Sequence, residues 1–543
     1  MSPLNHDGLV AHLKALIASC NYQIATELLG LLLTIVRQLS MNRTVRLRSS
    51  VPNSQFQSLG YNLALGIYRI WFHPLSRFPG PMLLSAFYFP YLYRSLIKGS
   101  WVRQVPALHQ RYGPVVRIAP DHLAIDGAVA WPEIYAHRPN TKPEFGRPAG
   151  LLFPGDELCI LGAPREAHRR MRRQLSLAFS DSALSEQEAT ISRFVGMLLD
   201  KIEVHSQGGK YVDIVEWLNF AVFDVVGDLA LSDSFHSLEN NAYHPWVHSI
   251  FLGIRGTQLA RFLGSYSFLK VFLGIFSISS ISAKDHSRMA AVEKTITRMG
   301  QGAESKSGRR DFVAYMMQET RSGEPGMSEQ EIIATTPILI IAGSETTGSA
   351  LSGLFFYLSQ NPFAYNALAD EVRSAFRSEA DITFRSTAPL EYLSACIDET
   401  LRVYPPAAET LPRISPGDFV QDKYIPKGTR ISVCAWATFR NPQYFFQPDT
   451  FSPQRWLSPS HPLYETKFSG DNREAFKPFS FGTRDCLGKN LAYAEMRLIA
   501  ARLIYRFDYK VMPNQESWHD QQRTYLGWEK GPLNVQLHRR IDA

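Results

Sequence analysis

The stretch Phe479-Ser-Phe-Gly482-Thr-Arg484-Asp-Cys486-Leu-Gly488 places one cysteine in a loop punctuated by glycines, and a helix-like run follows from Asn490. A thiolate just before a helix start faces free backbone N–H groups and the positive end of the helix dipole. The sequence therefore predicts a lowered thiol pKa for Cys486. Gly482 and Gly488 lack a Cβ, so the backbone can turn sharply and approach a flat ligand closely.

Two other side chains of this stretch suit a flat ligand that carries a metal. Arg484 could pair with a carboxylate of that ligand through charge-assisted hydrogen bonds. Phe479 could shield the sulfur, and shielding tunes the potential of a bound metal. A lone cysteine is more often buried and inert. The complete ten-residue pattern favours a metal-binding role for Cys486.

The pattern F-x-x-G-x-R-x-C-x-G resembles the haem-binding signature of the cytochrome P-450 superfamily, and all five fixed positions are present. The resemblance implies haem b as cofactor, with Cys486 as the axial thiolate ligand of the iron. It also implies the cytochrome P-450 fold, which is mainly α with a minor β portion. The resemblance runs from about residue 60 to 540.

Composition limits the classes of partner. The 543 residues are 45% hydrophobic, which is enough for a large core, and 57 basic against 50 acidic residues give a net charge of +7. No long Lys/Arg run or Cys/His finger spacing occurs, so we expect no nucleic-acid partner. The odd number of scattered cysteines predicts a reducing compartment and no disulfide framework: Cys20, Cys159, Cys396, Cys434 and Cys486.

Residues 1–72 are predicted to form a membrane-associating segment. The apolar run at 28–36 is shorter than the roughly 20 residues of a spanning helix, and the run at 63–72 is broken by Arg69. If the first run inserts, the positive-inside bias places the residues after Arg37 in the cytoplasm. The alternative is two amphipathic segments that lie on the bilayer surface. The resemblance implies the endoplasmic reticulum membrane, with a cytosolic catalytic domain.

The remaining chain is divided by its prolines. Residues 73–81 read as a proline-rich hinge, and residues 82–543 are predicted to form the haem-thiolate catalytic domain. Residues 112–120 indicate the start of a small sheet. From about 180 to 321 we expect mainly helix, and by analogy residues 251–281 form the roof over the substrate.

His168 and Arg172 lie four residues apart in a basic helical run and so share a face. Family members usually carry Trp and Arg there, which reach the haem propionates. His168 replaces the Trp, so only Arg172 carries over. The alternative is a solvated basic helix face.

An apolar helical run becomes polar at Ala342-Gly343-Ser-Glu345-Thr346-Thr347. Hydroxyls inside a helix can bond to the preceding turn and open a groove that holds water. The run resembles the superfamily's central-helix motif, in which Thr346 would hydrogen-bond dioxygen and Glu345 would supply protons. The alternative is an ordinary buried helix with satisfied hydroxyls. Pro337 costs about 3 kcal/mol in a helix interior, so the geometry before Ala342 is an open question.

Glu399 and Arg402 lie three apart on one predicted helix face, and Pro453-Gln-Arg455-Trp456 follows downstream. Together they resemble the superfamily's buried Glu-Arg-Arg triad, which is structural. The resemblance also makes Arg413 a propionate partner, ahead of Arg440. Residues 525–528 are expected to line the pocket.

The predicted function is monooxygenation of an apolar small molecule, by hydroxylation or epoxidation, with dioxygen as co-substrate. No flavin or dinucleotide motif follows Cys486, so electrons would come from NADPH through a separate flavoprotein reductase that docks near Lys477, Arg473 and Lys489. Several low-specificity stretches resemble fungal secondary-metabolite hydroxylases, including the trichothecene-pathway type. The alternatives are a haem-thiolate isomerase or dehydratase and a haem-based sensor; the Glu345-Thr346 pair argues against both.

Overall fold

The computed structural model describes residues 52–139, 141–150, 155–266, 291–302, 309–319 and 326–540. The chain divides into two units, Met1–Leu65 and Gly66–Ala543, and the features below belong to the second unit. The predicted apolar run at 28–36 and the arginines that follow it lie outside the described residues.

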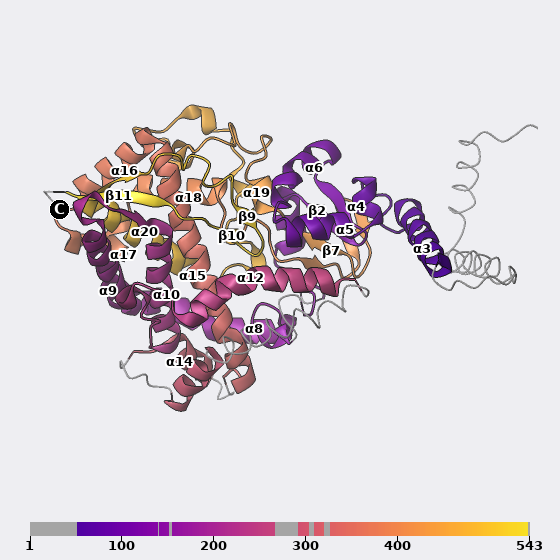
Figure 1. Cartoon of the computed structure of the whole chain (residues 1–543), viewed down its shortest axis with the longest axis horizontal. Helices are drawn as coiled ribbons and strands as arrows, with labels where there is room; N and C mark the ends of the chain where they lie inside the picture. Colours follow the sequence, from indigo (N-terminus) through magenta and orange to yellow (C-terminus); the bar gives the residue numbers. More distant parts are fainter. Residues whose placement is uncertain are drawn as a thin grey trace, which may run out of the picture. The chain divides into compact units, whose positions relative to one another are not determined.

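Long helices make up most of the second unit, as predicted from the family resemblance (Figure 1). They are α6 (Val105–Tyr112), α8 (Arg165–Ser176), α9 (Asp181–Ser206), α10 (Ile214–Leu231), α12 (Pro245–Gly264), α15 (Glu329–Gln360), α16 (Pro362–Ala375), α18 (Glu391–Val403) and α20 (Lys489–Arg506). Helix α3 (Pro52–Trp71) precedes them. The shorter helices are α4 (Met82–Ala86), α5 (Phe89–Leu92), α7 (Gly127–Ala130), α11 (Ser237–Asn240), α14 (Phe312–Met317), α17 (Phe384–Thr387) and α19 (Ala435–Thr438).

The strands form small sheets at the margins of the helical body. A four-stranded sheet has the order β1-β2-β7-β4, in which β2 and β7 are parallel and the other pairs are antiparallel. Its strands are β1 (Val115–Ala119), β2 (His122–Ile125), β4 (Arg413–Ile414) and β7 (Arg430–Ser432). The expected strand within residues 112–120 is thus β1. Because β4 closes this sheet, Arg413 is fixed in a buried position.

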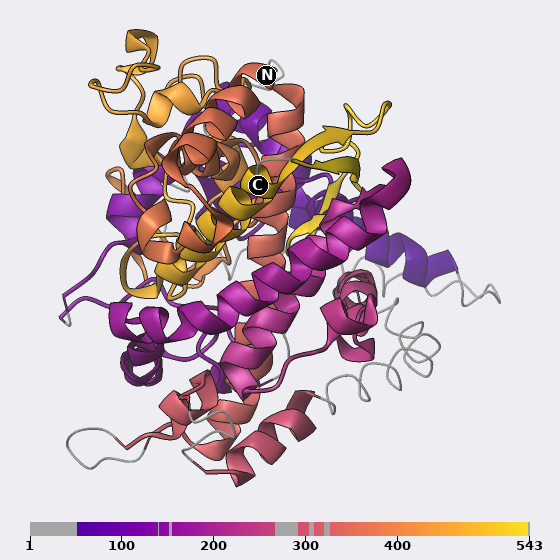
Figure 2. The ribbon, with the colours of Figure 1, turned by 90° about the vertical axis from the view of Figure 1, so that its left-hand side faces the viewer.

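The remaining strands form smaller sheets, either between strands that are adjacent in sequence or with strands near the C-terminal end of the chain. Figure 2 shows the yellow C-terminal strands beside the purple helices, in agreement with the packing of α9 on β3 and β11. These sheets are β3 (Tyr211–Asp213), β11 (Asn534–Arg539) and β8 (Phe507–Val511); β5 (Asp418–Val420) with β6 (Lys423–Ile425); and β9 (Arg523–Thr524) with β10 (Trp528–Glu529).

Helix α15 is the element on which the others pack, with α10, α14, α16, α18 and α20 against it. It begins in a capping box, in which the Ser328 hydroxyl accepts from Glu331 N–H and the Glu331 carboxylate accepts from Ser328 N–H. The helix continues through Pro337. The proline removes one backbone donor, yet α15 is continuous from Glu329 to Gln360.

Among the described residues, α15 is also the one helix long and apolar enough to cross a membrane, but 61% of its apolar window is buried inside the structure. It is therefore a core helix.

The proline-rich segment 73–81 is held against β1. Pro79 O accepts from Arg117 N–H at 2.8 Å, and a Cβ on Gly80 would lie 2.2 Å from Arg117 O. The buried Arg117 side chain also donates to Arg69 O at 2.6 Å and to Pro120 O at 2.7 Å. The chain therefore enters the helical body along a path that backbone contacts fix.

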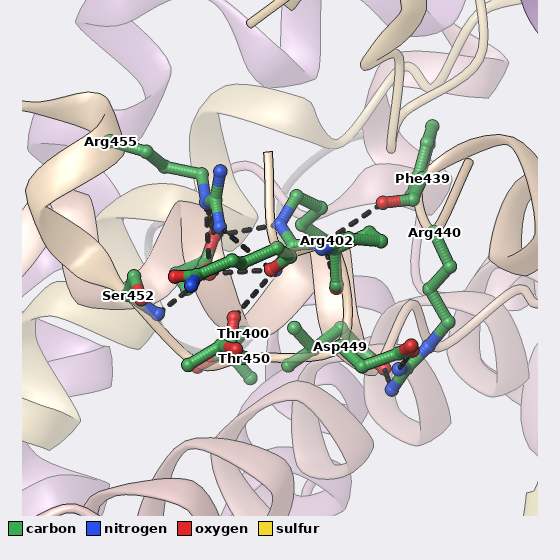
Figure 3. Close-up of polar contacts among 12 residues, drawn as sticks. Thr400, Arg402, Phe439, Arg440, Asp449, Thr450, Ser452 and Arg455 are labelled. Atoms are coloured by element: carbon green, nitrogen blue, oxygen red, sulfur yellow. Dashed lines mark hydrogen bonds and ion pairs between the residues drawn. The ribbon is translucent and has the colours of Figure 1, made fainter. Parts of the chain in front are cut away.

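A buried carboxylate joins α18 to the segment Pro453–Trp456 (Figure 3). Arg402 donates two hydrogen bonds of 2.8 Å to the Glu399 carboxylate, and Arg455 donates a third at 3.0 Å. Burial alone would raise the pKa of Glu399, but the two guanidinium groups outweigh it and hold the pKa below its usual value. The structure thus brings together the three residues of the predicted triad, each at most 1% exposed.

Arg402 also satisfies backbone carbonyls of the loop that follows α19. It donates to Phe439 O at 2.9 Å, to Pro448 O at 2.5 Å and to Thr450 O at 2.9 Å, while Arg440 pairs nearby with Asp449 at 2.6 Å. This loop has little regular structure. Its carbonyl groups therefore accept hydrogen bonds from Arg402 in place of the backbone hydrogen bonds that a sheet or helix would provide.

Glu399→Gln should lower the free energy of unfolding by about 3–5 kcal/mol, because it leaves the Arg402 guanidinium buried without a counter-charge and leaves Arg455 with Asp471 alone. Asp449→Asn is the matched control: its side chain is 82% exposed, so we expect a change within about 0.5 kcal/mol. Denaturant unfolding of the two variants beside the wild type makes the comparison, and equal effects would contradict a structural role for Glu399.

Candidate functional site

The cysteine loop has a defined backbone geometry. Cys486 N–H donates to Phe479 O at 2.8 Å, and Gly482 has a φ of +80°. A Cβ on Gly482 would lie 1.9 Å from Tyr135 O, so this position admits only glycine. Gly488 differs, because a Cβ there would meet Phe179 at an ordinary 3.6 Å. Gly488 is the residue just before α20, as expected for a cysteine that precedes a helix start.

Cys486 differs from the other cysteines of the described residues. Cys159, Cys396 and Cys434 are buried, whereas Cys486 is exposed; Cys20 lies outside the described residues. At the same time, removal from bulk water by the surrounding protein raises the pKa of the Cys486 thiol. The Cys486 sulfur can therefore be reached by a ligand although the surrounding protein desolvates it, as is expected of a ligand to a bound cofactor.

The predicted direction of that pKa shift was wrong. The Gly488 N–H, Arg172 and Lys489 do lower the pKa of Cys486, but desolvation and the neighbouring Asp485 outweigh them. The helix start alone therefore does not hold a thiolate in this loop. A coordinating metal ion would, because it deprotonates its thiol ligand outright.

Arg172 lies beside the cysteine loop but pairs with the protein itself. It donates to Asp485 O at 2.7 Å and forms an ion pair with the Asp485 carboxylate. The basic run is the helix α8, as expected, but His168 on it is 7% exposed, so the helix face is not a solvated one.

A cluster of arginines surrounds His168. Burial lowers the pKa of His168 to about 3, and the positive charges of Arg484, Arg172, Arg413 and Arg147 act in the same direction. His168 is therefore neutral at physiological pH. Burial lowers the pKa of Arg413 as well, and the neighbouring charge of Arg484 adds to that effect. The group holds more positive charge than the nearby Glu144 and Asp485 neutralise.

Several donors of this cluster are unused. Arg484 Nη2 donates to Glu144 at 2.8 Å and to Ala163 O at 2.9 Å, but its Nε and Nη1 are buried without a partner among the described residues. The Nε atoms of Arg413 and Arg147 are likewise buried and unpartnered there. Buried donors normally find acceptors. Two carboxylates of a haem would supply both the acceptors and the missing negative charge, so the residues fit the cofactor.

The sequence predicted Arg484 and Arg413 for this role, but it did not indicate Arg147. Arg147 follows a glycine in a loop and donates to Leu411 O at 2.6 Å, 264 residues away. No local motif marks it, since its neighbours come from distant parts of the chain.

The second set of predicted residues lies on α15. Ala342 and Thr346 are exposed on a helix that is otherwise mostly buried, and they lie one turn apart on the same face. The Thr346 hydroxyl donates to Ala342 O at 2.7 Å, which is the back-bonding expected of a hydroxyl inside a helix. The Thr346 side chain therefore remains accessible while its hydroxyl is bonded within the helix.

Glu345 points toward the C-terminal part of the chain. Lys530 forms an ion pair with Glu345 Oε1, and Ser349 donates to the same oxygen at 3.2 Å. A Cβ on Gly527 would lie 3.9 Å from that oxygen, so the predicted pocket loop at 525–528 does reach α15. No sequence pattern indicates Lys530, whose partner lies 185 residues away.

The residues expected at the reductase-docking face have different environments. Lys477 pairs with Glu474 at 2.8 Å and lies over the Phe481 ring, and Arg473 donates inward to Arg455 O. Lys489 is exposed at the start of α20.

Comparison with known proteins gives one consistent answer. The sequence profile described as Cytochrome P450 matches residues 79–537. The chain is 37% identical to trichothecene C-15 hydroxylase of Fusarium sporotrichioides over 88% of this chain and 96% of that protein. It is 36% identical to cytochrome P450 monooxygenase astJ of Aspergillus oryzae, over 90% and 97%, and 37% identical to cytochrome P450 monooxygenase astA of Talaromyces wortmannii, over 88% and 95%.

Proposed function

Because the chain belongs to the cytochrome P450 family and is therefore a haem b monooxygenase with cysteine thiolate ligation, we propose that Cys486 supplies the thiolate. We further propose that the enzyme inserts one atom of dioxygen into an apolar small molecule, while the other leaves as water and NADPH supplies two electrons. The observation that carries the proposal is the reachable, desolvated Cys486 beside arginine donors that lack partners among the described residues.

Different residues of the chain would bind different parts of the haem. Arg484, Arg413 and Arg147 would hold the two propionates, since each has a buried donor left over within the described structure. The Gly488 N–H stabilises negative charge on the Cys486 sulfur, and Phe479 fixes the loop through its carbonyl. When bound, the haem supplies the redox chemistry, and thiolate ligation favours O–O cleavage. Arg172 acts indirectly, because its pairing with Asp485 orients the residue next to the ligand.

Proton supply is assigned to Thr346 and Glu345. The Thr346 hydroxyl is exposed and can turn from Ala342 O to donate into the accessible space. Glu345 is its neighbour in sequence and has one buried oxygen without a partner among the described residues. A general acid typically contributes 10²–10⁴-fold in rate. The presence of this pair therefore favours an oxygenase over a haem protein that needs no proton transfer.

For substrate class, the proposal is a fungal secondary metabolite that is hydroxylated or epoxidised. Support comes from the name of the Fusarium relative, a trichothecene C-15 hydroxylase. The loop at 525–528 adds an apolar group, because Leu526 is 49% exposed beside Gly527, which approaches Glu345.

We assign electron supply to a separate NADPH-dependent flavoprotein reductase that docks near Lys489. For the chain's organisation we keep residues 1–72 as a membrane-associating segment of the endoplasmic reticulum, 73–81 as the hinge and 82–543 as the cytosolic catalytic domain. Exposed apolar side chains on both sides of the hinge support this assignment: Trp71, Phe72, Met82 and Leu83.

Cys486→Ala should remove haem-thiolate character, since the other described cysteines are buried. The reduced carbon monoxide complex of the wild type should show the red-shifted Soret band of thiolate ligation, and the variant should not. Cys159→Ala serves as the control that keeps the band. A variant at Cys486 that retains it would refute the assignment.

Thr346→Ala should leave haem content and substrate binding intact while product per NADPH falls by about 10²-fold, with the electrons recovered as hydrogen peroxide. Thr347→Ala is the matched control, because Thr347 is buried on another face. Equal coupling in Thr346→Ala and the wild type would make Thr346 an ordinary packed residue.

Reduction by the reductase should slow as salt rises, because exposed charge contacts are screened. Lys489→Glu should slow it further at low salt, whereas Lys423→Glu on β6, also exposed, should not. Stopped-flow reduction at two ionic strengths measures this. Rates that are independent of salt and of Lys489 would exclude this docking face.

A further inference from the structure

Lys530 is a buried lysine that the proposed mechanism has not yet used. Its side chain is 4% exposed and forms an ion pair with Glu345, whose side chain is 16% exposed. The same ammonium donates to Ser349 Oγ at 2.7 Å. Lysine is almost never buried this deeply unless it is paired. The buried position of Lys530 therefore depends on its ion pair with Glu345, and the position of the Glu345 carboxylate depends on the same pair.

The two oxygens of Glu345 have different roles. Oε1 accepts from both Lys530 and Ser349. Oε2 is buried and has no partner among the described residues. The carboxylate is thus held by one oxygen, and the other is left to a water, through which a proton can reach the hydroxyl of Thr346.

The other titratable groups near Glu345 are neutral. Tyr243 and Tyr404 both come within electrostatic range of it, and burial raises the pKa of each phenol. Tyr404 is occupied as a donor to Gln522 at 2.6 Å. Lys530 is therefore the cation that faces Glu345 from the elements packed around it in the described structure.

The loop that carries Lys530 is fixed in place. Trp528 Nε1 donates to Pro405 O at 2.8 Å, and the Trp528 ring stacks on Tyr404 with centroids 5.1 Å apart. Gly527 lies beside Glu345, where a Cβ would make an ordinary contact at 3.9 Å. The ammonium group is thus presented to α15 by a rigid support.

We propose that Lys530 is a positioning residue for proton delivery: it fixes Glu345 through Oε1 so that Oε2 passes protons from water to Thr346. The inference rests on the proposed roles of Glu345 and Thr346. In each cycle Oε2 of the carboxylate takes up a proton from the water side and gives it to the Thr346 hydroxyl as that hydroxyl passes its own proton on, so the Glu345 carboxylate and the Thr346 hydroxyl are both regenerated and the Lys530 ammonium keeps its protons. A purely structural role does not account for the burial of Lys530 and Glu345, because buried ion pairs add little stability over apolar residues of the same volume.

The test compares Lys530→Met, Lys530→Arg and Glu345→Gln in the holoenzyme. Lys530→Met should lower product per NADPH by about tenfold or more, part of the 10²-fold or more expected for loss of a proton donor, while haem content and substrate affinity stay unchanged. Lys530→Arg keeps the charge and should restore most of the coupling. Arg170→Met is the matched control, since it breaks an ion pair with Glu331 on the same helix and should couple as the wild type does.

A second readout does not depend on turnover. A buried carboxylate that loses its cation takes up a proton instead of remaining charged. Infrared spectra of Lys530→Met should therefore show a protonated carboxyl C=O band that the wild type and the double variant Lys530→Met/Glu345→Gln lack. If Lys530→Met does not accumulate as holoenzyme, Lys530→Gln, which keeps an amide donor, should change both readouts in the same direction.

The outcomes separate the inference from the function on which it rests. If Glu345→Gln couples as well as the wild type, the proposed proton path is wrong. If Glu345→Gln uncouples but Lys530→Met is as well coupled as the wild type, or shows no carboxyl band, the role of Lys530 is overturned while the proposed function stands. A loss of thermal stability alone in Lys530→Met would likewise reduce Lys530 to a structural residue.

Discussion

The carboxylate of Glu399 is the group on which the rest of the architecture depends. Because Glu399 is fully buried, donors from the protein must meet its lone pairs. Arg402 and Arg455 meet it from two sides, and Ser452 N–H and Trp456 Nε1 complete the set at 2.8 and 2.9 Å. These donors come from segments 50 to 60 residues apart, so one buried charge fixes the path of a long loop with little regular structure.

That fixed path leads to the cysteine. Arg455 pairs with Asp471, and Arg473 donates back to Arg455 O, which fixes the chain just before Phe479. From there the bond between Cys486 N–H and Phe479 O and the close approach of Gly482 to Tyr135 define the loop. The position of the sulfur is therefore set by charge satisfaction in the core as well as by the loop's own glycines.

The arginine cluster around His168 has an excess of buried positive charge. Arg147, Arg413 and Arg484 keep unpartnered donors within the described structure, and a neutral His168 lies among them. A fold that leaves buried donors unsatisfied gains stability when an anionic ligand arrives, because the ligand binds the native state and not the unfolded one. Cofactor binding and stability of this chain are thus linked through the same arginines.

The family resemblance carried by local motifs predicted the fold class, and the same motifs indicated the cysteine loop, the hydroxyls on the central helix and the triad. They failed where the decisive partner is distant in sequence. Lys530, Arg147 and the pairing of Arg172 with Asp485 join segments more than 180 residues apart, and no periodicity marks such pairs. The pKa of Cys486 was assigned the wrong direction because a sequence shows the helix start but not the depth of burial that outweighs it.

The central claim is that these buried interactions present the Cys486 sulfur to the haem iron. X-ray absorption at the iron edge of the purified holoprotein measures this most directly, because a first-shell sulfur scatters differently from nitrogen or oxygen. The account predicts one sulfur scatterer in the iron's first shell. A first shell that contains only nitrogen and oxygen would contradict it.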